Sequence, residues 1–227
     1  MPQYEAWEKE YKNPILVTKG EEPQKDILRF LKFLKKKEKI ALKGFNVLDL
    51  GAGVGRNSIY FAAFGSNVVG LEISDSAIKI SCERAKGKNL QVEFLKHDIG
   101  TKYPFEDEYF DLILDITSSN SLNDKERKIY LTEVNRVLKK GGYFFVRALC
   151  KDGDKNAQNL LKTNPGKDPD TYIMKDLSLQ EKVFSKKSFV ELYARYFKIL
   201  KLIKKTNYPR VGSRIYKRSY WLGYMGK

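Results

Sequence analysis

Short apolar runs alternate along this chain with longer stretches whose apolar residues recur every three or four positions. The short runs predict buried strands over Asn46–Leu50, Asn67–Leu71, Gln91–Leu95, Tyr109–Asp115 and Tyr143–Leu149. The longer stretches predict helices over Arg56–Phe64, from Ser74 or Asp75 to about Lys86, and from Asp124 to about Lys140. This alternation predicts an α/β fold, in which a doubly wound, mostly parallel sheet carries helices on both faces.

The two ends of the chain carry further predicted elements. From Pro23 onward an apolar stripe predicts one more helix, formed by Ile27, Phe30, Leu31 and Leu34. Ser185 is a suitable cap for a helix that reaches about Phe197. Lys198–Lys204 and Lys217–Tyr224 then predict two strands that form an antiparallel C-terminal hairpin. With these two strands the predicted sheet is seven-stranded.

The N-terminal segment is polar but contains three aromatic residues. Tyr4, Trp7 and Tyr11 are spaced by three and four positions, which puts them on one face if the segment is helical. We expect a helix docked on the domain, and the functional alternative is an aromatic lid over a cofactor or substrate.

A long polar connection occupies residues 151–182. It contains the turn signals Asn164-Pro165-Gly166 and Asp168-Pro169-Asp170 and no clear periodicity. Irregular segments of this length inside a compact domain are often functional, and the alternative is a disordered insertion.

Three glycines, Gly51, Gly53 and Gly55, lie between the first strand and its helix, and Glu72 ends the second strand. Glycine tolerates positive φ and lets a ligand approach the backbone closely. A glycine turn followed about 20 positions later by an acidic residue is the general arrangement that holds an adenosine ribose. Arg56 stands where the dinucleotide fingerprint requires a small residue, and the Gly-Lys-Ser/Thr of a P-loop is absent. The first observation argues against a dinucleotide site, and the second argues against a P-loop nucleotide site.

The segment Asp49-Leu-Gly-Ala-Gly-Val-Gly55 resembles motif I of the class I S-adenosylmethionine (SAM) methyltransferases. The resemblance covers residues 45–149 with motifs and extends more loosely to the end of the chain. It implies SAM as the cofactor and S-adenosylhomocysteine as the product. It also implies that the C-terminal hairpin lies beside the fifth strand and that residues 151–182 roof the substrate pocket.

The resemblance further implies which residues hold the cofactor. Asp49 would help to hold the methionine amino end, Glu72 would accept hydrogen bonds from both ribose hydroxyls, and Asp98 would bind the adenine amino group. The full implied set is Asp49, Gly51, Ala52, Gly53, Gly55, Glu72, Ile73, Asp98, Ile99 and Asp115. His97 is the only histidine, and we expect it to be structural and not a base.

The loop after the fourth strand lies next to the departing methyl group in this family. Nucleic-acid amino methyltransferases usually carry an Asn/Asp-Pro-Pro-aromatic motif here, and cytosine C5 enzymes need a Pro-Cys nucleophile. This chain has neither. Asp115, Ser118 and Asn120 are the substrate-side candidates, the alternative being that they cap the next helix. No catalytic base stands out.

The length and composition of the chain restrict the classes of protein to which it can belong. A chain of 227 residues with 42% apolar residues is long enough for one full core, so we expect a single domain. Its segments would be residues 1–43 (helical or lid), 44–150 (cofactor half), 151–182 (roof) and 183–227 (helix and hairpin). No apolar run is long enough for a membrane span, and the N-terminus lacks the apolar core of a signal peptide. Cys82 and Cys150 are too few for a disulfide framework or a zinc site, so we expect a cytoplasmic protein without a metal.

The net charge of +15 is concentrated at the C-terminal end. Residues 184–227 contain twelve Lys and Arg against one acid, Glu191, which gives +11 of the total. Basic residues interleaved with Tyr and Trp can form a nucleic-acid surface. Lysines on an edge strand also protect a sheet against aggregation, and we favour this second explanation.

These observations predict a methyltransferase that acts on a heteroatom of a small-molecule acceptor by in-line displacement. One alternative is an RNA or protein methyltransferase that uses the basic C-terminal face. The other is a SAM-binding protein that transfers no methyl group.

Overall fold

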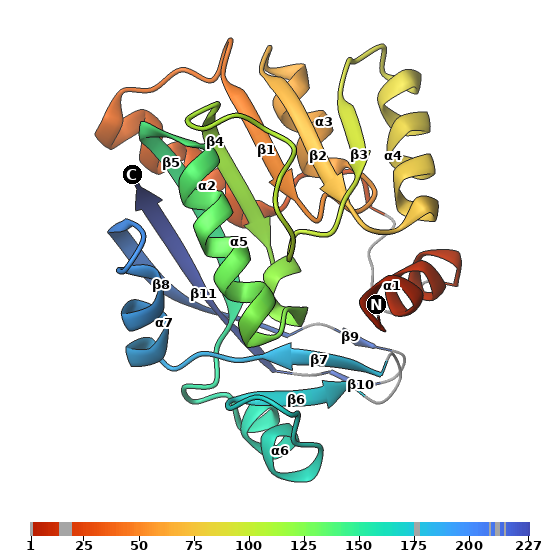
Figure 1. The fold of residues 1–227 in the computed structure, drawn as a ribbon, viewed down its shortest axis with the longest axis vertical. Helices are drawn as coiled ribbons and strands as arrows, with labels where there is room; N and C mark the ends of the chain where they lie inside the picture. Colours follow the sequence, from red (N-terminus) through yellow and green to blue (C-terminus); the bar gives the residue numbers. More distant parts are fainter. Residues whose placement is uncertain (1, 14–19, 175–177, 209, 212–213, 216) are drawn as a thin grey trace.

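The computed structural model describes residues 2–13, 20–174, 178–208, 210–211, 214–215 and 217–227. A seven-stranded sheet runs through its centre in the order β3-β2-β1-β4-β5-β11-β8 (Figure 1). Its strands are β1 (Asn46–Leu50), β2 (Asn67–Glu72), β3 (Glu93–Lys96), β4 (Phe110–Ile116), β5 (Leu138–Leu149), β8 (Lys198–Asn207) and β11 (Arg218–Gly226). Strands β1 to β5 are parallel, whereas β11 is antiparallel to both β5 and β8. The predicted sheet and its antiparallel C-terminal hairpin are confirmed.

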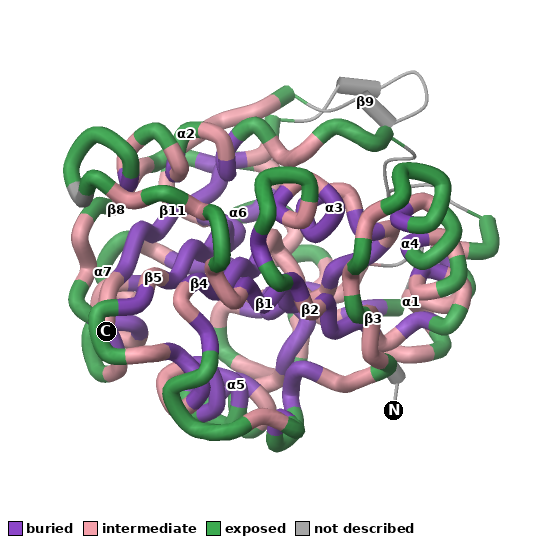
Figure 2. The backbone as a smooth tube through the Cα atoms, turned by 90° about the horizontal axis from the view of Figure 1, so that it is seen from above, coloured by how far each residue is buried: buried purple, intermediate pink, exposed green. Residues whose placement is uncertain are grey.

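Helices cover both faces of this sheet, which buries the strands between two apolar layers (Figure 2). The main helices are α2 (Lys25–Phe33), α3 (Arg56–Ala63), α4 (Asp75–Gly87), α5 (Asp124–Val137) and α7 (Lys186–Tyr193). One core joins the sheet to α5 and α7, and the other joins it to α2 and α3. Leu48 of β1 belongs to the first core and its neighbour Val47 to the second, because successive strand side chains point to opposite faces. Burial on both faces explains why Val47, Leu48 and Leu50 of β1 are all apolar.

Side-chain caps fix where the helices begin. Ser74 accepts a hydrogen bond from the Ala77 amide at the start of α4. Asn123 and Glu126 form the predicted reciprocal capping box at the start of α5. Each cap satisfies a backbone N–H that has no partner within the helix.

The boundary between α5 and β5 differs from the sequence-based expectation. The helix ends at Val137, and Leu138 to Gly142 belong to the strand, which was expected to begin at Tyr143. Leu138 pairs with Phe110 of β4 and is fully buried, so tertiary pairing overrides the helical pattern that continues through the two lysines. The register of the β4–β5 pairing shifts between Phe110 and Leu112 of β4. Gly141 lies in the part of β5 opposite this shift and has a φ of 76°, which glycine tolerates. Similarly, α7 ends at Tyr193, before the predicted Phe197.

The connection of residues 151–182 is not irregular where the structure describes it. It contains α6 (Lys155–Thr163) and the antiparallel strands β6 (Thr171–Met174) and β7 (Leu179–Lys182). Tyr172 and Leu179 are buried, so this pair of strands has a packed face. The disordered-insertion alternative is therefore wrong for these residues.

The remaining elements are one further helix and four short segments. They are α1 (Pro2–Lys12), a π-helical turn (Leu34–Glu38), a 3-10 turn (Ser118–Ser121), β9 (Arg210–Val211) and β10 (Arg214–Ile215). Within the described ranges, the helices are all too short or too polar to cross a lipid bilayer.

Candidate active site

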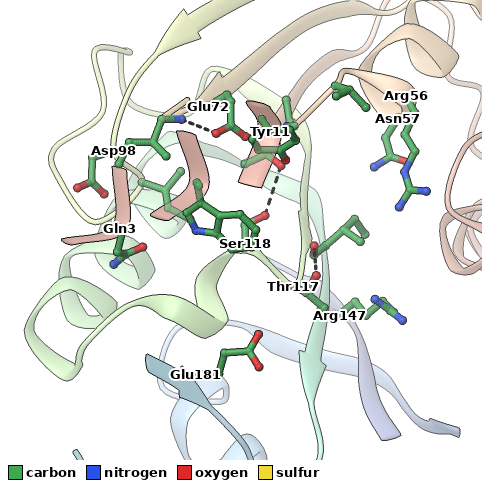
Figure 3. A pocket seen from close by; sticks show the side chains of 18 of the residues that line it. Gln3, Tyr11, Arg56, Asn57, Glu72, Asp98, Thr117, Ser118, Arg147 and Glu181 are labelled. Carbon is green, nitrogen blue, oxygen red and sulfur yellow. Dashed lines mark hydrogen bonds between the residues drawn. The ribbon is translucent and has the colours of Figure 1, made fainter. Parts of the chain in front are cut away.

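A pocket of about 330 Å³ opens at the carboxyl ends of β1, β2, β3 and β4 (Figure 3). β2 lies next to β1, and β3 lies next to β2. The next strand in the sequence, β4, lies on the other side of β1. In doubly wound sheets, ligands bind where the strand order reverses in this way. The helix α1 and the strands β5, β7 and β11 supply further walls.

The glycine turn after β1 forms one wall of the pocket. Gly51 and Gly53 have φ values of 67° and 56°, which favour glycine. A Cβ on Gly51 would clash with the Ser118 side chain, and one on Gly53 would lie 2.7 Å from the Tyr11 hydroxyl. Glycine at these two positions therefore lets the Ser118 and Tyr11 side chains approach the backbone of the turn closely.

Glu72 closes the end of β2, and its carboxylate is buried in the pocket wall. It accepts hydrogen bonds from the backbone amides of Gly53 at 2.8 Å, Ile73 at 2.8 Å and Ser74 at 2.9 Å. Burial raises the pKa of Glu72, although these three donors act in the opposite direction. The carboxylate is thus held in one orientation and joins the glycine turn to β2.

The loop after β4 brings Thr117 and Ser118 to the pocket, next to the glycine turn (Figure 3). Thr117 has a φ of 67°, an uncommon conformation for a β-branched residue. Asp115 lies beneath this loop and accepts hydrogen bonds from the Ser118 amide at 2.9 Å, the Ser119 amide at 3.3 Å and the Tyr130 hydroxyl at 2.6 Å. The buried carboxylate of Asp115 therefore sets the course of the loop.

The loop after β3 supplies His97, Asp98 and Ile99 to the same pocket. Asp98 accepts a hydrogen bond from the Gly100 amide at 2.8 Å, which turns the loop. The Nε2 atom of His97 lies 3.2 Å from the hydroxyl oxygen of Thr101, and the His97 ring packs edge-on against the ring of Tyr103. The contacts of His97 are those of a structural residue.

The helix α1 lies across the pocket and contributes Gln3, Trp7 and Tyr11 to its wall. Tyr4 does not line the pocket, because its hydroxyl donates to Asp75 at 2.7 Å outside it. The expectation of a docked helix holds, and two of the three aromatic residues are placed as a lid would require.

The carboxylate of Glu8 fastens α1 to the rest of the molecule. It accepts hydrogen bonds from the Ser74 hydroxyl at 2.7 Å and from the amide and hydroxyl of Ser76 at 3.1 and 2.6 Å. Burial alone would raise the pKa of Glu8, but these donors lower it to about 2. The contact lies at the N-terminus of α4, where a negative charge is favoured.

The end of the pocket opposite Glu72 and Asp98 is formed by charged and aromatic residues of β5, β7 and β11 (Figure 3). Arg218 donates to the Glu181 carboxylate at 2.5 Å and to the Tyr172 hydroxyl at 2.9 Å. Arg147 lies over the Tyr220 ring, with its guanidinium carbon 3.5 Å from the ring centre. The pocket thus has two chemically distinct ends.

Comparison with known proteins agrees with this geometry. The family described as methyltransferase domain matches residues 47–142. A putative protein N5-glutamine methyltransferase of Methanocaldococcus jannaschii is 30% identical over 160 residues, which cover 62% of this chain and 78% of that protein. The chain is a class I SAM-dependent methyltransferase.

Two further similarities show how widely this methyltransferase domain is used. Phosphoethanolamine N-methyltransferase 1 of Zea mays is 34% identical over 53% of this chain, which spans only 24% of the maize protein. A SAM-dependent methyltransferase structure from Methanosarcina mazei superposes with a TM-score of 0.72 at 23% identity, over 82% of this chain and 93% of that one. The second similarity supports the fold alone.

The site of this methyltransferase fits its cofactor. The glycine turn lines the pocket, and the buried Glu72 carboxylate lines it from the end of β2. A carboxylate in this position suits two neighbouring hydroxyl groups, such as those of a ribose.

The pocket brings together most of the residues implied by motif I. These are Gly51, Ala52, Gly53, Glu72, Ile73, Asp98 and Ile99, together with the candidate Ser118. Asp49, Gly55, Asp115 and Asn120 do not line it.

Each of these four residues supports the pocket from behind. Asp49 is buried and accepts a hydrogen bond from the Ser58 hydroxyl at 2.7 Å, and Asn120 accepts one from the Leu149 amide at 3.3 Å. A Cβ on Gly55 would lie 2.8 Å from side-chain atoms of α4 and β3, so this glycine permits close packing. Asp115 accepts hydrogen bonds from the 3-10 turn and Asn120 from the backbone of β5, so neither residue caps α5, whose cap is Asn123.

The sequence analysis missed several residues of the methyltransferase pocket. They are Arg56, Asn57, Thr117, Arg147, Met174, Glu181, Arg218 and Tyr220. A signal existed for Arg147, which interrupts the apolar run Tyr143–Leu149. No comparable signal marked Glu181 or Arg218, because their approach depends on how the roof strands pack against β11.

Proposed function

We propose that this methyltransferase transfers the methyl group of SAM to a heteroatom of a small-molecule acceptor. The observation that supports the proposal is the roofed pocket with two different ends. One end carries Glu72 and Asp98, and the other carries the charged and aromatic groups of β5, β7 and β11. A roofed pocket suits a small acceptor, whereas a polymer requires an open groove.

We assign the cofactor to the end formed by the glycine turn. Glu72 would accept hydrogen bonds from the ribose hydroxyls, and Asp98 would bind the adenine amino group. Ala52, Ile73 and Ile99 supply apolar contacts along the same wall. Asp49 lies behind the turn, so its direct bond to the methionine amino group stays a prediction.

The bound cofactor supplies a methyl group on a positively charged sulfur, which is already a good leaving group. The residues around Thr117 and Ser118 would hold the acceptor in line with that group, and proximity can supply most of the rate. Glu181 is poorly placed as a base, because Arg218 and Tyr172 both donate to its carboxylate. The reacting heteroatom of the acceptor would attack with its own lone pair, and any proton that it loses would pass to solvent, so the step needs no dedicated base.

The roofed pocket also separates this proposal from its alternatives. The relatives include a putative protein methyltransferase as well as a small-molecule enzyme, so their names do not choose between acceptors. Part of the C-terminal charge is used inside the molecule, since Arg218 pairs with Glu181 and Lys205 with Asp26. This weakens the case for a polymer docked on the basic face.

We further propose that residues 1–43, 44–150, 151–182 and 183–227 act as one domain. Residues from all four segments line the same pocket. A cytoplasmic location is supported by Cys82 and Cys150, which are both free thiols.

A direct test is calorimetric titration of the protein with S-adenosylhomocysteine, followed by assay of metabolite, RNA and protein fractions with methyl-labelled SAM. We expect micromolar binding and label in a small-metabolite product. At a ligand concentration 100 times the dissociation constant, binding should raise stability by roughly 2.7 kcal/mol. Label in RNA or protein alone would overturn the acceptor class, and binding without transfer to any fraction would favour the non-catalytic alternative.

A further inference from the structure

The charged residues at the acceptor end of the pocket are not balanced. Two arginines, Arg147 and Arg218, line this end of the pocket, while Glu181 is the one carboxylate there among the described residues. Arg218 already pairs with Glu181, and Tyr172 completes this group through bonds to both. Glu181 therefore does not balance the charge of Arg147.

Arg147 has only a shared partner. Its Nε lies 3.3 Å from the Oδ2 atom of Asp26, but the geometry is not that of a hydrogen bond. Asp26 is fully buried and pairs more closely with Lys205, at 2.5 Å, while Arg29 approaches it at 3.5 Å. One carboxylate thus faces three cations, so Asp26 balances the charge of Arg147 only in part.

The stacked position of Arg147 leaves its outer nitrogens for a ligand. The guanidinium lies against the Tyr220 ring, which fixes its plane within the pocket. Among the described residues, its outer nitrogens donate no hydrogen bond to a protein acceptor. A planar guanidinium held in this way matches a carboxylate or phosphate through two parallel hydrogen bonds.

Arg56 is a second cation near the same space. Its hydrogen bond goes to the side-chain oxygen of Gln24 at 3.3 Å, which is neutral. Burial and then the nearby charge of Arg147 lower the pKa of Arg56. Two guanidinium groups that repel one another in one pocket favour the binding of anions between them.

The proposed function accounts for one of these two cations. Arg56 begins α3 directly after the glycine turn, which is where the methionine carboxylate of the cofactor would lie. Arg147 lies on β5, among the groups at the other end, and has no such assignment.

We propose that the methyl acceptor is an anion, whose carboxylate or phosphate group binds to the guanidinium of Arg147. This inference rests on the proposed methyl transfer and names the class of its acceptor. Tyr220 and Met174 border the same space and would contact the uncharged part of the molecule.

The test starts from a metabolite extract that is divided on an anion-exchange resin at pH 7. The retained and unretained pools are each incubated with the protein and methyl-labelled SAM. We expect label in a product of the retained pool, and a labelled product from the unretained pool alone would overturn the proposal. Failure of both pools to accept label would instead count against the proposed function.

Two treatments of the retained pool distinguish the two anions. Alkaline phosphatase should abolish acceptor activity if the group is a phosphate monoester, and amidation with carbodiimide and an amine should abolish it if the group is a carboxylate. Activity that survives both treatments would contradict the proposal.

Substitutions of Arg147 then test whether its guanidinium binds the anionic group of the acceptor. Arg147→Gln should lower methyl transfer at limiting acceptor roughly 10- to 100-fold, because a charged hydrogen-bond partner is lost. Its affinity for S-adenosylhomocysteine should stay within about twofold, which also shows that the variant folds, since Lys205 still pairs with Asp26. Arg147→Lys should restore part of the loss.

The matched control is Lys201→Gln, which removes an exposed cation of β8. It should change neither methyl transfer at limiting acceptor nor the affinity for S-adenosylhomocysteine. Arg56→Gln should weaken binding of S-adenosylhomocysteine instead. Unchanged transfer by Arg147→Gln would overturn the assignment.

Discussion

Individual carboxylates at the ends of β1, β2 and β4 shape this methyltransferase pocket, but they do so in different ways. Glu72 faces the pocket, while Asp49 and Asp115 are buried behind it. All three have a raised pKa because burial disfavours the charged form. This difference in position gives separate predictions for binding and for stability.

Replacement of Glu72 should weaken cofactor binding. Glu72→Ala removes the proposed acceptor of two ribose hydroxyls, which should cost about 1.5–3 kcal/mol of binding free energy. Asp107→Ala is the control, because Asp107 lies in an exposed turn and pairs with Arg136 far from the pocket. Calorimetry with S-adenosylhomocysteine measures both, and equal affinities for the wild type and Glu72→Ala would contradict the assignment of Glu72.

Asp49 should make stability depend on pH. Burial raises its pKa from 3.8 to about 6, against the hydrogen bond from Ser58. Between these values the folded protein binds more protons than the unfolded chain, so stability falls as the pH rises through this window.

Asp49→Asn keeps an acceptor for Ser58 and removes this titration. The stability of the variant relative to the wild type should therefore increase from pH 4 to pH 6, by up to about 3 kcal/mol at about 1.4 kcal/mol per pKa unit. Thermal unfolding of both proteins across this range measures the difference. A constant difference would show that Asp49 does not titrate in this way.

At the scale of elements, the roof of the pocket consists of α1 on one side and β6–β7 on the other. The described part of α1 is held to α4 mainly through Glu8, whereas β7 is tied to β11 through the Glu181–Arg218 pair. Gln3 and Tyr4 each add one hydrogen bond, to Glu126 and Asp75, but Glu8 accepts three and is the largest of these polar attachments.

Glu8→Ala should loosen α1 and weaken the binding of S-adenosylhomocysteine. Trp7 lines the pocket, so its fluorescence reports on the helix, and Trp221→Phe removes the other tryptophan. In that background we expect Glu8→Ala to shift the emission of Trp7 to longer wavelength before ligand is added. Lys12→Ala is a suitable control, because Lys12 only pairs with Glu8 at the exposed surface. An unchanged spectrum together with unchanged affinity would show that α1 is held by its other contacts.

At the scale of the whole molecule, the main question is the purpose of the large positive charge. Arg218 was expected on the basic C-terminal face, but it lies in the pocket wall, and Lys227 donates to the backbone carbonyls of Asn135 and Leu138. The lysines that do face solvent include Lys187, Lys198 and Lys201. A test of the surface must use these three and leave Arg218 in place.

Reversal of Lys187, Lys198 and Lys201 to Glu should leave methyl transfer to a small acceptor within a few-fold. A polymer acceptor would lose affinity steeply with salt, with a slope of about −0.7 per phosphate contact on single strands. The salt dependence is measured from the rates of methyl transfer by the wild type and the triple variant at several salt concentrations. Loss of transfer in the triple variant, while S-adenosylhomocysteine still binds, would support an RNA acceptor.

The sequence by itself determined the order of strands and helices from residue 44 to 150, the glycine turn and the acidic end of β2. These features are local, because apolar periodicity, helix caps and glycines at positive φ act within a few residues. The family resemblance then placed the C-terminal hairpin beside β5, as the structure confirms.

Only the tertiary structure decided which residues share the acceptor end of the pocket. Arg147, Glu181 and Arg218 come from three strands that are far apart in the sequence, and they meet because the roof packs against β11. Pairing with Phe110 of β4 made Leu138 a strand residue, and bonds to the following loop and to Tyr130 hold Asp115 behind the wall instead of in it. A sequence pattern carries no record of such contacts, since they depend on how distant elements lie against each other.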